Sequence, residues 1–257
     1  MSSPETTPPA PLRHDDGSDR DWPVPVVADR TPWQQQLDEL LFREKAHTRE
    51  GDAIAAARRR LPMVEVDGSA ALEGKAGPTS LLDAFEGRRM LVAYFHMWYD
   101  GAPAPGQCEG CTFFSSQVRE LSYLHSRDVT WAVFSQGPYP ESARYREFMG
   151  QDAPWYSVVD REKLVADRWF GMQVCYLRVG DRVYETYWSS GRAAEVFAPS
   201  YGLLDLTVYG RQEAWEDSPD GWPRLFTADS SGGAFRLGGR PIGQWPRLEQ
   251  GYDDTLS

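Results

Sequence analysis

Short apolar runs alternate with amphipathic stretches through the middle of the chain. Residues 90–97 (MLVAYFHM) and 129–135 (VTWAVFS) are nearly continuous apolar runs, which are typical of strands buried on both faces of a sheet. Further strands are expected at 63–66, 155–159, 174–179 and 183–187, and helices at 108–125, 140–149, 163–169 and beyond 193. The pattern predicts a compact α/β unit.

The part of the chain ahead of this unit has a different character. Residues 1–30 are rich in Pro, Ser, Thr and Asp, a composition that buries too little surface to offset the entropy of ordering, so we expect a disordered tail. A long helix is expected next, with Thr31 as its N-cap, Pro32 at its first position and a weak point at Gly51. Its apolar residues follow one stripe, and Pro62 ends it.

These patterns divide the chain into four segments. They are a tail (1–30), an N-terminal helical extension (31–61), an α/β domain (62–211) and a C-terminal extension without clear periodicity (212–257). The basic run Arg58–Arg60 gives the helical extension a charged face. That face either forms salt bridges with the acidic body or contributes to an anion site.

Charge and hydropathy exclude several classes of function. The 257 residues carry 38 acidic and 27 basic side chains, a formal net charge of −11, which disfavours binding to nucleic acid and to anionic membranes. An apolar run of about 18 residues, as a membrane-spanning helix requires, does not occur in the sequence. The N-terminus lacks the basic start and apolar middle of a signal peptide. We therefore expect a protein of the reducing cytoplasm.

Two of the three cysteines form the sharpest local motif. Three are too few for a disulfide scaffold, but Cys108 and Cys111 follow a buried strand and a Pro/Gly loop, at the start of a predicted helix. A helix N-terminus favours a thiolate, so Cys108 would attack a disulfide and Cys111 would resolve the intermediate. The negative charge of Glu109 disfavours a thiolate at the neighbouring Cys108, so we expect the cysteine pair to be a weak oxidant at most. The alternative is that both cysteines are small buried apolar residues.

Three further residues are candidates for this site. His96 ends the strand that leads to the cysteine loop, where it would be a base, an acid or a soft-metal ligand, or a core histidine bonded to a backbone carbonyl. Asp100 is a candidate for proton transfer to the buried thiol. Cys175 is expected to be a buried strand residue, with a relay of oxidation as the weaker alternative. A structural zinc site is disfavoured because the sequence offers no second cysteine pair.

Several motifs in order give the chain a family resemblance. They are REKAHTREGDAIAAARRRLPMVEV, SLLDAFEGRRMLVAYFHMW, CEGCTFF, DVTWAVFSQ and YGLLDLTVYGR. Together they resemble the bacterial thioredoxin-like proteins grouped as domain of unknown function 899, which are predicted dithiol–disulfide oxidoreductases. The resemblance covers residues 31–211. It implies a thioredoxin-like fold, a central mixed sheet flanked by helices, with Cys108 and Cys111 at the redox positions.

The sequence departs from related patterns in two places. Thioredoxins carry a proline facing the cysteine pair, whereas the corresponding stretch 171–174 (GMQV) has none. In thioredoxin-like proteins that lack this proline, the space beside the cysteines is open to a metal, which gives weight to a copper(I) site of Cys108, Cys111 and His96. Peroxiredoxins have Pro and Thr seven and three residues before the reactive cysteine, where this chain has Gly101 and Pro105. Peroxide reduction of that type is therefore disfavoured.

Three hypotheses from different classes remain open. The leading one is a dithiol–disulfide oxidoreductase acting on a small-molecule or protein thiol or disulfide, without a required cofactor, in which His96 and Asp100 tune the thiols or move protons. The second is a copper-dependent metalloprotein, and the third is a non-catalytic interaction module whose acidic tails recruit a partner. The sequence carries no signal for an oligomeric state.

Overall fold

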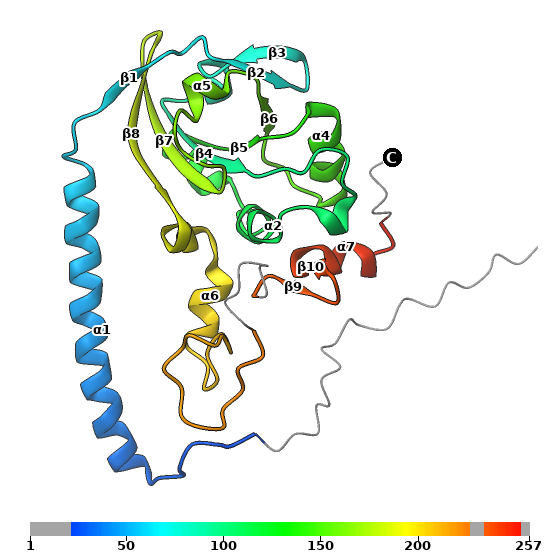
Figure 1. Cartoon of the computed structure of the whole chain (residues 1–257). Coiled ribbons are helices and arrows are strands. Elements are labelled where there is room, and N and C mark those ends of the chain that lie inside the picture. Colours follow the sequence, from blue (N-terminus) through cyan, green and yellow to red (C-terminus); the bar gives the residue numbers. More distant parts are fainter. Residues whose placement is uncertain (1–21, 227–233, 253–257) are drawn as a thin grey trace, which may run out of the picture.

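The computed structural model describes residues 22–226 and 234–252, and its centre is an eight-stranded mixed sheet (Figure 1). The strand order is β1-β8-β7-β4-β5-β6-β2-β3. The strands are β1 (Val64–Val66), β2 (Ala71–Gly74), β3 (Gly77–Ser80), β4 (Met90–His96), β5 (Val129–Ser135), β6 (Trp155–Val158), β7 (Met172–Val179) and β8 (Arg182–Ser190). The tail expected at 1–30 lies largely outside the described residues.

The pairing around β4 gives the sheet its thioredoxin-like topology. Strand β4 is parallel to β5 on one side and antiparallel to β7 on the other, and β7 and β8 form an antiparallel hairpin with a turn at Gly180. Strands β5 and β6 continue the parallel part. The helix that carries the two clustered cysteines begins after β4, as the family resemblance implies. The expected α/β, thioredoxin-like fold is confirmed.

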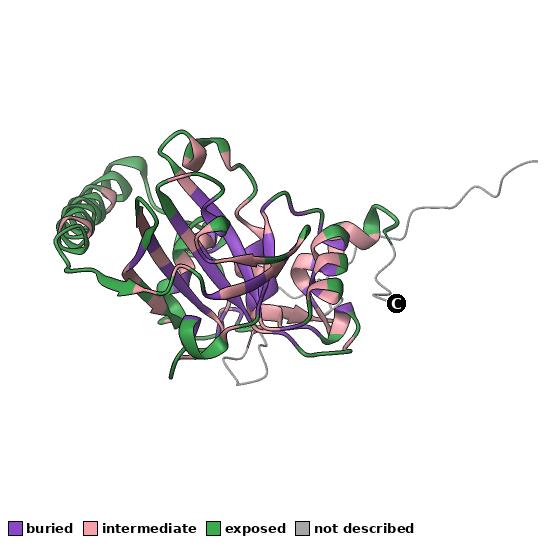
Figure 2. Cartoon of the chain, turned by 90° about the horizontal axis from the view of Figure 1, so that it is seen from above, coloured by how far each residue is buried: buried purple, intermediate pink, exposed green. Residues whose placement is uncertain are grey.

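Both faces of the central strands are covered. Leu91 and Phe95 of β4 pack in one cluster with Leu164, the last residue of the short helix α5 (Arg161–Leu164). The alternate residue Tyr94 packs on the opposite face with Trp131 of β5 and Cys111. Figure 2 shows the buried residues concentrated in these strands. Burial on both faces explains why their sequences are nearly continuous apolar runs.

The helices are mostly short. They are α1 (Arg30–Arg58), α2 (Glu109–Ser116), α3 (Ser122–His125), α4 (Tyr139–Phe148), α5, α6 (Pro199–Leu204) and α7 (Trp245–Glu249), with 3₁₀ turns at Asp83–Phe85, Ala104–Gly106, Gly191–Phe197 and Ile242–Gln244. Among the described residues, none of these helices is long and apolar enough to cross a membrane.

Several element boundaries differ from the sequence prediction. The single helix expected at 108–125 is two helices, α2 and α3, separated by residues 117–121. In this break the Arg119 guanidinium donates to the carbonyl oxygens of Ser116 and Gly150. The helix expected at 163–169 ends after Leu164, and Ala166 adopts a positive φ of 53°. The hairpin β2–β3 was not predicted.

The N-terminal helix α1 is more exposed than its apolar stripe predicts. It begins at Arg30, after Asp29 rather than Thr31, and runs through Gly51 without interruption. It contains no buried residue within its described span. Its last residue, Arg58, lies over the Tyr187 ring of β8, with the guanidinium carbon 5.0 Å from the ring centroid. The stripe therefore does not pack against the sheet.

Part of the C-terminal extension has regular structure. Residues 234–252 contain the short hairpin of β9 (Arg236–Leu237) and β10 (Arg240–Pro241), followed by a 3₁₀ turn and α7. Both β10 and the 3₁₀ turn contact α2. The end of the chain thus returns to the helix that carries the cysteines (Figure 1).

Candidate functional site

Cys108 occupies the N-cap position of α2. Its Sγ accepts a hydrogen bond from the backbone N–H of Cys111 at 3.5 Å. The Cys111 thiol also donates to this sulfur, and it is the main reason that the pKa of Cys108 lies below its usual value. Burial and the Glu109 charge act in the opposite direction, while the N–H of Gly110 helps to lower the pKa. The site therefore favours a thiolate at Cys108.

Cys111 is held in the opposite state. Its side chain is buried, 3% exposed, and its Sγ accepts a hydrogen bond from the backbone N–H of Met97 at 3.3 Å. Burial, followed by the neighbouring Cys108 sulfur, raises the pKa of Cys111 well above its usual value. The Tyr94 hydroxyl also hydrogen-bonds to the Cys111 sulfur. The half-buried Cys108, whose environment favours the thiolate, thus lies beside the buried Cys111, whose environment favours the thiol.

His96 lies in an aromatic cluster on the same face of the sheet. The ring centroids of Trp155, Trp98 and Tyr145 are 5.1, 6.1 and 6.2 Å from its own. His96 is fully buried, and its Nδ1 hydrogen-bonds to the carbonyl oxygen of Met97 at 2.7 Å. Burial lowers its pKa to about 4. Its environment is that of a core histidine bonded to a backbone carbonyl, one of the two alternatives that the sequence leaves open.

The other two predicted residues are Asp100 and Cys175. Asp100 is exposed in the loop after β4, and within the described residues no hydrogen bond or ion pair joins it to either sulfur. Cys175 is in β7 opposite Val92, and burial raises its pKa to about 11 although the charge of Arg58 acts against this. The roles suggested for Asp100 and Cys175 stay predictions.

The copper hypothesis requires a third ligand beside the two sulfurs. In the part of the chain that the structure describes, no three His, Cys, Asp or Glu side chains form a group that could hold a metal ion. Cys108 and Cys111 are close together. The Nδ1 atom of His96 is engaged by the Met97 carbonyl oxygen, and its Nε2 atom is buried without a hydrogen-bond partner among the described residues. The copper site of Cys108, Cys111 and His96 stays a prediction.

Two hollows lie on different parts of the surface. One of about 430 Å³ is lined by residues of the loop after β4, including Met97 and Tyr99, and by Arg161, Trp169 and Phe170. Burial and then the nearby Cys108 sulfur raise the pKa of Tyr99. Met97, which also lines this hollow, donates its backbone N–H to the Cys111 sulfur at 3.3 Å.

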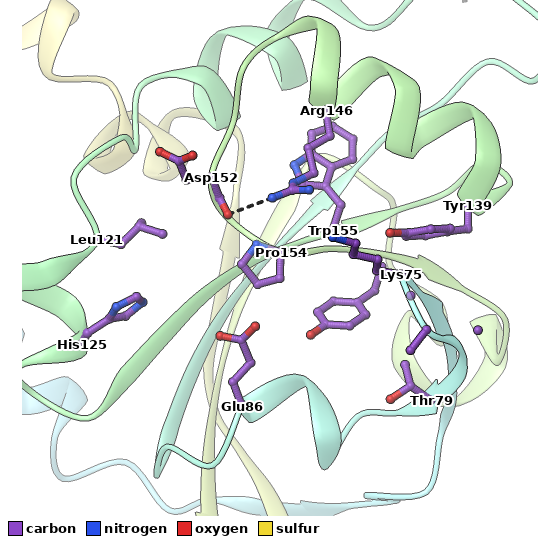
Figure 3. Close-up of a pocket in the computed structure, with 14 residues that line it drawn as sticks. Lys75, Thr79, Glu86, Leu121, His125, Tyr139, Arg146, Asp152, Pro154 and Trp155 are labelled. Carbon is purple, nitrogen blue, oxygen red and sulfur yellow. Dashed lines mark hydrogen bonds between the residues drawn. The ribbon is translucent and has the colours of Figure 1, made fainter.

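The other hollow, of about 420 Å³, includes Lys75, His125, Tyr139 and Arg146 in its lining (Figure 3). Neither lining contains a cysteine. The first hollow is the one lined by Met97, whose backbone N–H donates to the Cys111 sulfur.

The sequence did not indicate the residues that reach this site from the C-terminal extension. Arg236 forms an ion pair with Glu109 at 3.0 Å, and Gln244 is fully buried beside the loop that precedes Cys108. Arg236 and Glu109 are separated by 127 positions, so no local pattern connects them.

The topology around β4 and the dithiol at the start of α2 define a thioredoxin-like protein. The chain belongs to the family described as "Bacterial protein of unknown function (DUF899)", whose model matches residues 23–229. The C-terminal residues 234–252 lie beyond this match. No curated protein matches the chain in sequence.

Two solved structures similar to this chain come from Xanthomonas campestris. One is the bacterioferritin comigratory protein, described for its alkyl peroxide reduction activity, with 14% identity, a TM-score of 0.34, and coverage of 53% of this chain and 94% of that protein. The other is a cysteine-to-serine variant of peroxiredoxin Q, with 14% identity, a TM-score of 0.34, and coverage of 55% of this chain and 96% of that one.

Proposed function

We propose that the protein is a dithiol–disulfide oxidoreductase in which Cys108 attacks and Cys111 resolves. The observation that carries the proposal is the position of Cys108 at the N-cap of α2, where its sulfur accepts a hydrogen bond from the backbone N–H of Cys111 at 3.5 Å. Such contacts stabilise a thiolate, which is the reactive form of cysteine. The same contact holds the second sulfur within reach of the first.

The reduction of a substrate disulfide proceeds in two exchanges. The Cys108 thiolate attacks one substrate sulfur, the substrate S–S bond breaks, and the first substrate thiolate leaves and takes up a proton. Cys111 then loses its proton and attacks Cys108, and the second substrate thiol is released as the Cys108–Cys111 disulfide forms. Two electrons pass from the two cysteines to the substrate, which gains two protons. The reverse sequence oxidises a substrate dithiol.

The contacts of Cys111 suit the second exchange. The Met97 N–H and the Tyr94 hydroxyl both donate to its sulfur and lower the cost of forming its thiolate, against the larger effect of burial. Cys111 therefore stays protonated until the mixed disulfide forms on Cys108. The hollow beside Met97 and Tyr99 is the side from which we expect a substrate to approach. Its apolar lining fits a small apolar disulfide or a side chain of a protein substrate.

A redox titration tests the proposal. The purified protein is equilibrated with mixtures of reduced and oxidised glutathione, quenched with acid and analysed by mass spectrometry. We expect an intramolecular Cys108–Cys111 disulfide with a single two-electron midpoint, unchanged in Cys175→Ser. If wild-type protein and Cys175→Ser both stay fully reduced or carry only glutathione on single cysteines, the dithiol mechanism is wrong.

A trapping experiment assigns the two roles. In Cys111→Ser the mixed disulfide on Cys108 cannot be resolved, so we expect it to accumulate with a disulfide substrate such as oxidised glutathione. Cys108→Ser is expected to form no mixed disulfide on the same timescale, because Cys111 is buried and its pKa is raised. Accumulation in Cys108→Ser instead would reverse the assignment.

A further inference from the structure

The guanidinium of Arg236 lies across the loop that carries Cys108. One of its nitrogens, Nη2, donates to the carbonyl oxygen of Gln107 at 3.1 Å and to the Glu109 carboxylate at 3.0 Å. The other, Nη1, donates to the carbonyl oxygen of Pro105 at 2.6 Å. Arg236 therefore contacts the residues on both sides of Cys108. A planar fork with several fixed donors is suited to such bridging, which a lysine could not reproduce.

Phe235 anchors this arginine against the first turn of α2. Its ring centroid lies 4.8 Å from that of Phe113 and 5.9 Å from that of Phe114. Phe235 also covers Gly110, where an added Cβ would lie 3.6 Å from the Phe235 ring. Gly110, one of the two residues between the cysteines, thus lies next to the C-terminal segment.

The same C-terminal segment is also linked to the carbonyl oxygen of Cys108 by a chain of hydrogen bonds. The Gln244 amide donates to the Tyr145 hydroxyl at 2.9 Å and to the carbonyl oxygen of Ala104 at 2.7 Å. The Tyr145 hydroxyl lies 2.6 Å from the Thr112 hydroxyl, which itself donates to the carbonyl oxygen of Cys108 at 2.8 Å. Since Gln244 is fully buried, these bonds are shielded from water.

We infer that the C-terminal segment 235–244 is part of the redox site, and that Arg236 is a positioning residue for Cys108. It neutralises the Glu109 carboxylate and holds the backbone on both sides of the attacking sulfur. The inference deepens the proposed dithiol function and rests on it, although the effect on Cys108 itself can be measured without a disulfide. It also gives a chemical role to residues that lie beyond the part of the chain matched by the family.

The charge arrangement explains why Glu109 does not prevent a thiolate beside it. The Glu109 charge raises the pKa of Cys108, and a cation paired with that carboxylate reduces the opposing field. The side chains of Arg236 and Glu109 are 24% and 18% exposed, so water screens their pairing only partly. Loss of Arg236 should therefore disfavour the reduced, thiolate form of Cys108.

The test measures how fast Cys108 reacts with iodoacetamide at pH 7, in the full-length protein. For Arg236→Gln we expect the rate to fall by about two- to fivefold, the range set by ion pairs that are partly exposed. If the dithiol function holds, the midpoint potential also moves to more negative values by about 10 to 20 mV, since a tenfold change is about 30 mV for a two-electron couple. Failure to form the disulfide would remove the second measurement and leave the first intact.

Arg247 provides a matched control in the same extension. Its guanidinium donates to the carbonyl oxygen of Phe148 at 2.6 Å and contacts α4 rather than the cysteine loop. Arg247→Gln is expected to leave the alkylation rate of Cys108 unchanged. Equal slowing in both variants would show that general loosening of the extension is responsible, and an unchanged rate in Arg236→Gln would also overturn the inference.

A double-mutant cycle tests whether Arg236 acts through Glu109. In the Glu109→Gln background the opposing charge is already absent, so we expect Arg236→Gln to slow alkylation less than it does in the wild type. Identical slowing in the two backgrounds would contradict the role assigned to the Glu109 pair. Near-ultraviolet circular dichroism of each variant confirms that the aromatic packing around Phe235 is retained.

Discussion

The backbone N–H of Met97 donates a hydrogen bond to the sulfur of Cys111 at 3.3 Å. Met97 directly follows the last residue of β4, so the buried thiol is tied to the end of the central strand. Cys108 instead occupies the N-cap of α2, where its sulfur is only half-buried. Because the sulfurs of Cys108 and Cys111 differ in burial and in hydrogen bonding, we expect the two thiols to react at different rates.

The first prediction concerns the order of thiol reactivity. Cys108 should react with iodoacetamide at pH 7 at least about tenfold faster than Cys111 or Cys175, because alkylation requires the thiolate. The pKa of Cys108 is lowered, that of Cys111 is raised, and that of Cys175 is raised to about 11. Peptide mass spectrometry after brief labelling measures the three rates. Labelling of Cys175 first would contradict the assignment.

The second prediction concerns acid stability. In the folded protein burial lowers the pKa of His96 to about 4. In the unfolded chain a histidine has a pKa of about 6.5. Between these values the unfolded state binds more protons, so the free energy of unfolding falls as pH falls, by about 1.4 kcal/mol per pH unit. His96→Phe should flatten this slope between pH 6.5 and 4.5 in urea unfolding. The same slope in both proteins would show that His96 is not the group responsible.

The third prediction concerns the close packing of Gly137 against the ring of Trp98. A Cβ at Gly137 would overlap the ring of Trp98, which is 3% exposed and donates from its indole N–H to Glu141 at 3.0 Å. Gly137→Ala should therefore lower the free energy of unfolding by about 1 to 3 kcal/mol. Gly202→Ala is the control, since an added Cβ there meets nothing within 4 Å. Urea titration compares the two, and equal stability would contradict the packing of Trp98.

The fourth prediction concerns the independence of α1. Gly51 lies inside the helix, seven residues before its last residue Arg58, and a Cβ added there meets nothing within 4 Å. Gly51→Ala should stabilise the helix locally by about 1 kcal/mol, and slow hydrogen exchange of nearby amides by about fivefold. The urea midpoint of the sheet should not move, because α1 has no buried residue. A shifted midpoint would mean that α1 unfolds together with the sheet.

The central part of the fold could be predicted because its signals are local. Strands β4 and β5 are continuous apolar runs, and the two cysteines follow the first of them at the start of a helix. The β2–β3 hairpin was not predicted because its four-residue strands contain Gly74, Gly77 and Pro78, which are depleted in strands and typical of turns. Residue type rather than length thus separates this hairpin from the equally short β6, whose Trp, Tyr and Val residues are typical of a strand.

Only the part of the candidate site that is contiguous in the sequence could be predicted in detail. Cys108, Cys111 and the opposing charge of Glu109 follow from the motif itself. The ion pair of Arg236 with Glu109 joins positions 127 apart, and only the folded chain brings them together. For His96, the choice between a reactive group and a core residue depends on the Met97 carbonyl oxygen and on burial. Neither is visible in the residue types alone.

The N-terminal helix has a mechanical consequence. At one end Arg58 lies over the Tyr187 ring, and ahead of the other end Trp22 packs edge-on against Tyr209, with centroids 5.1 Å apart. Twenty-nine helical residues span about 44 Å at 1.5 Å per residue, so α1 separates its two flanking contacts by most of that length. Inserting one helical turn would lengthen α1 by about 5.4 Å, which the non-helical residues 23–29 would have to absorb for both contacts to persist. The chain is thus held at both ends of α1, although no residue of the helix itself is buried.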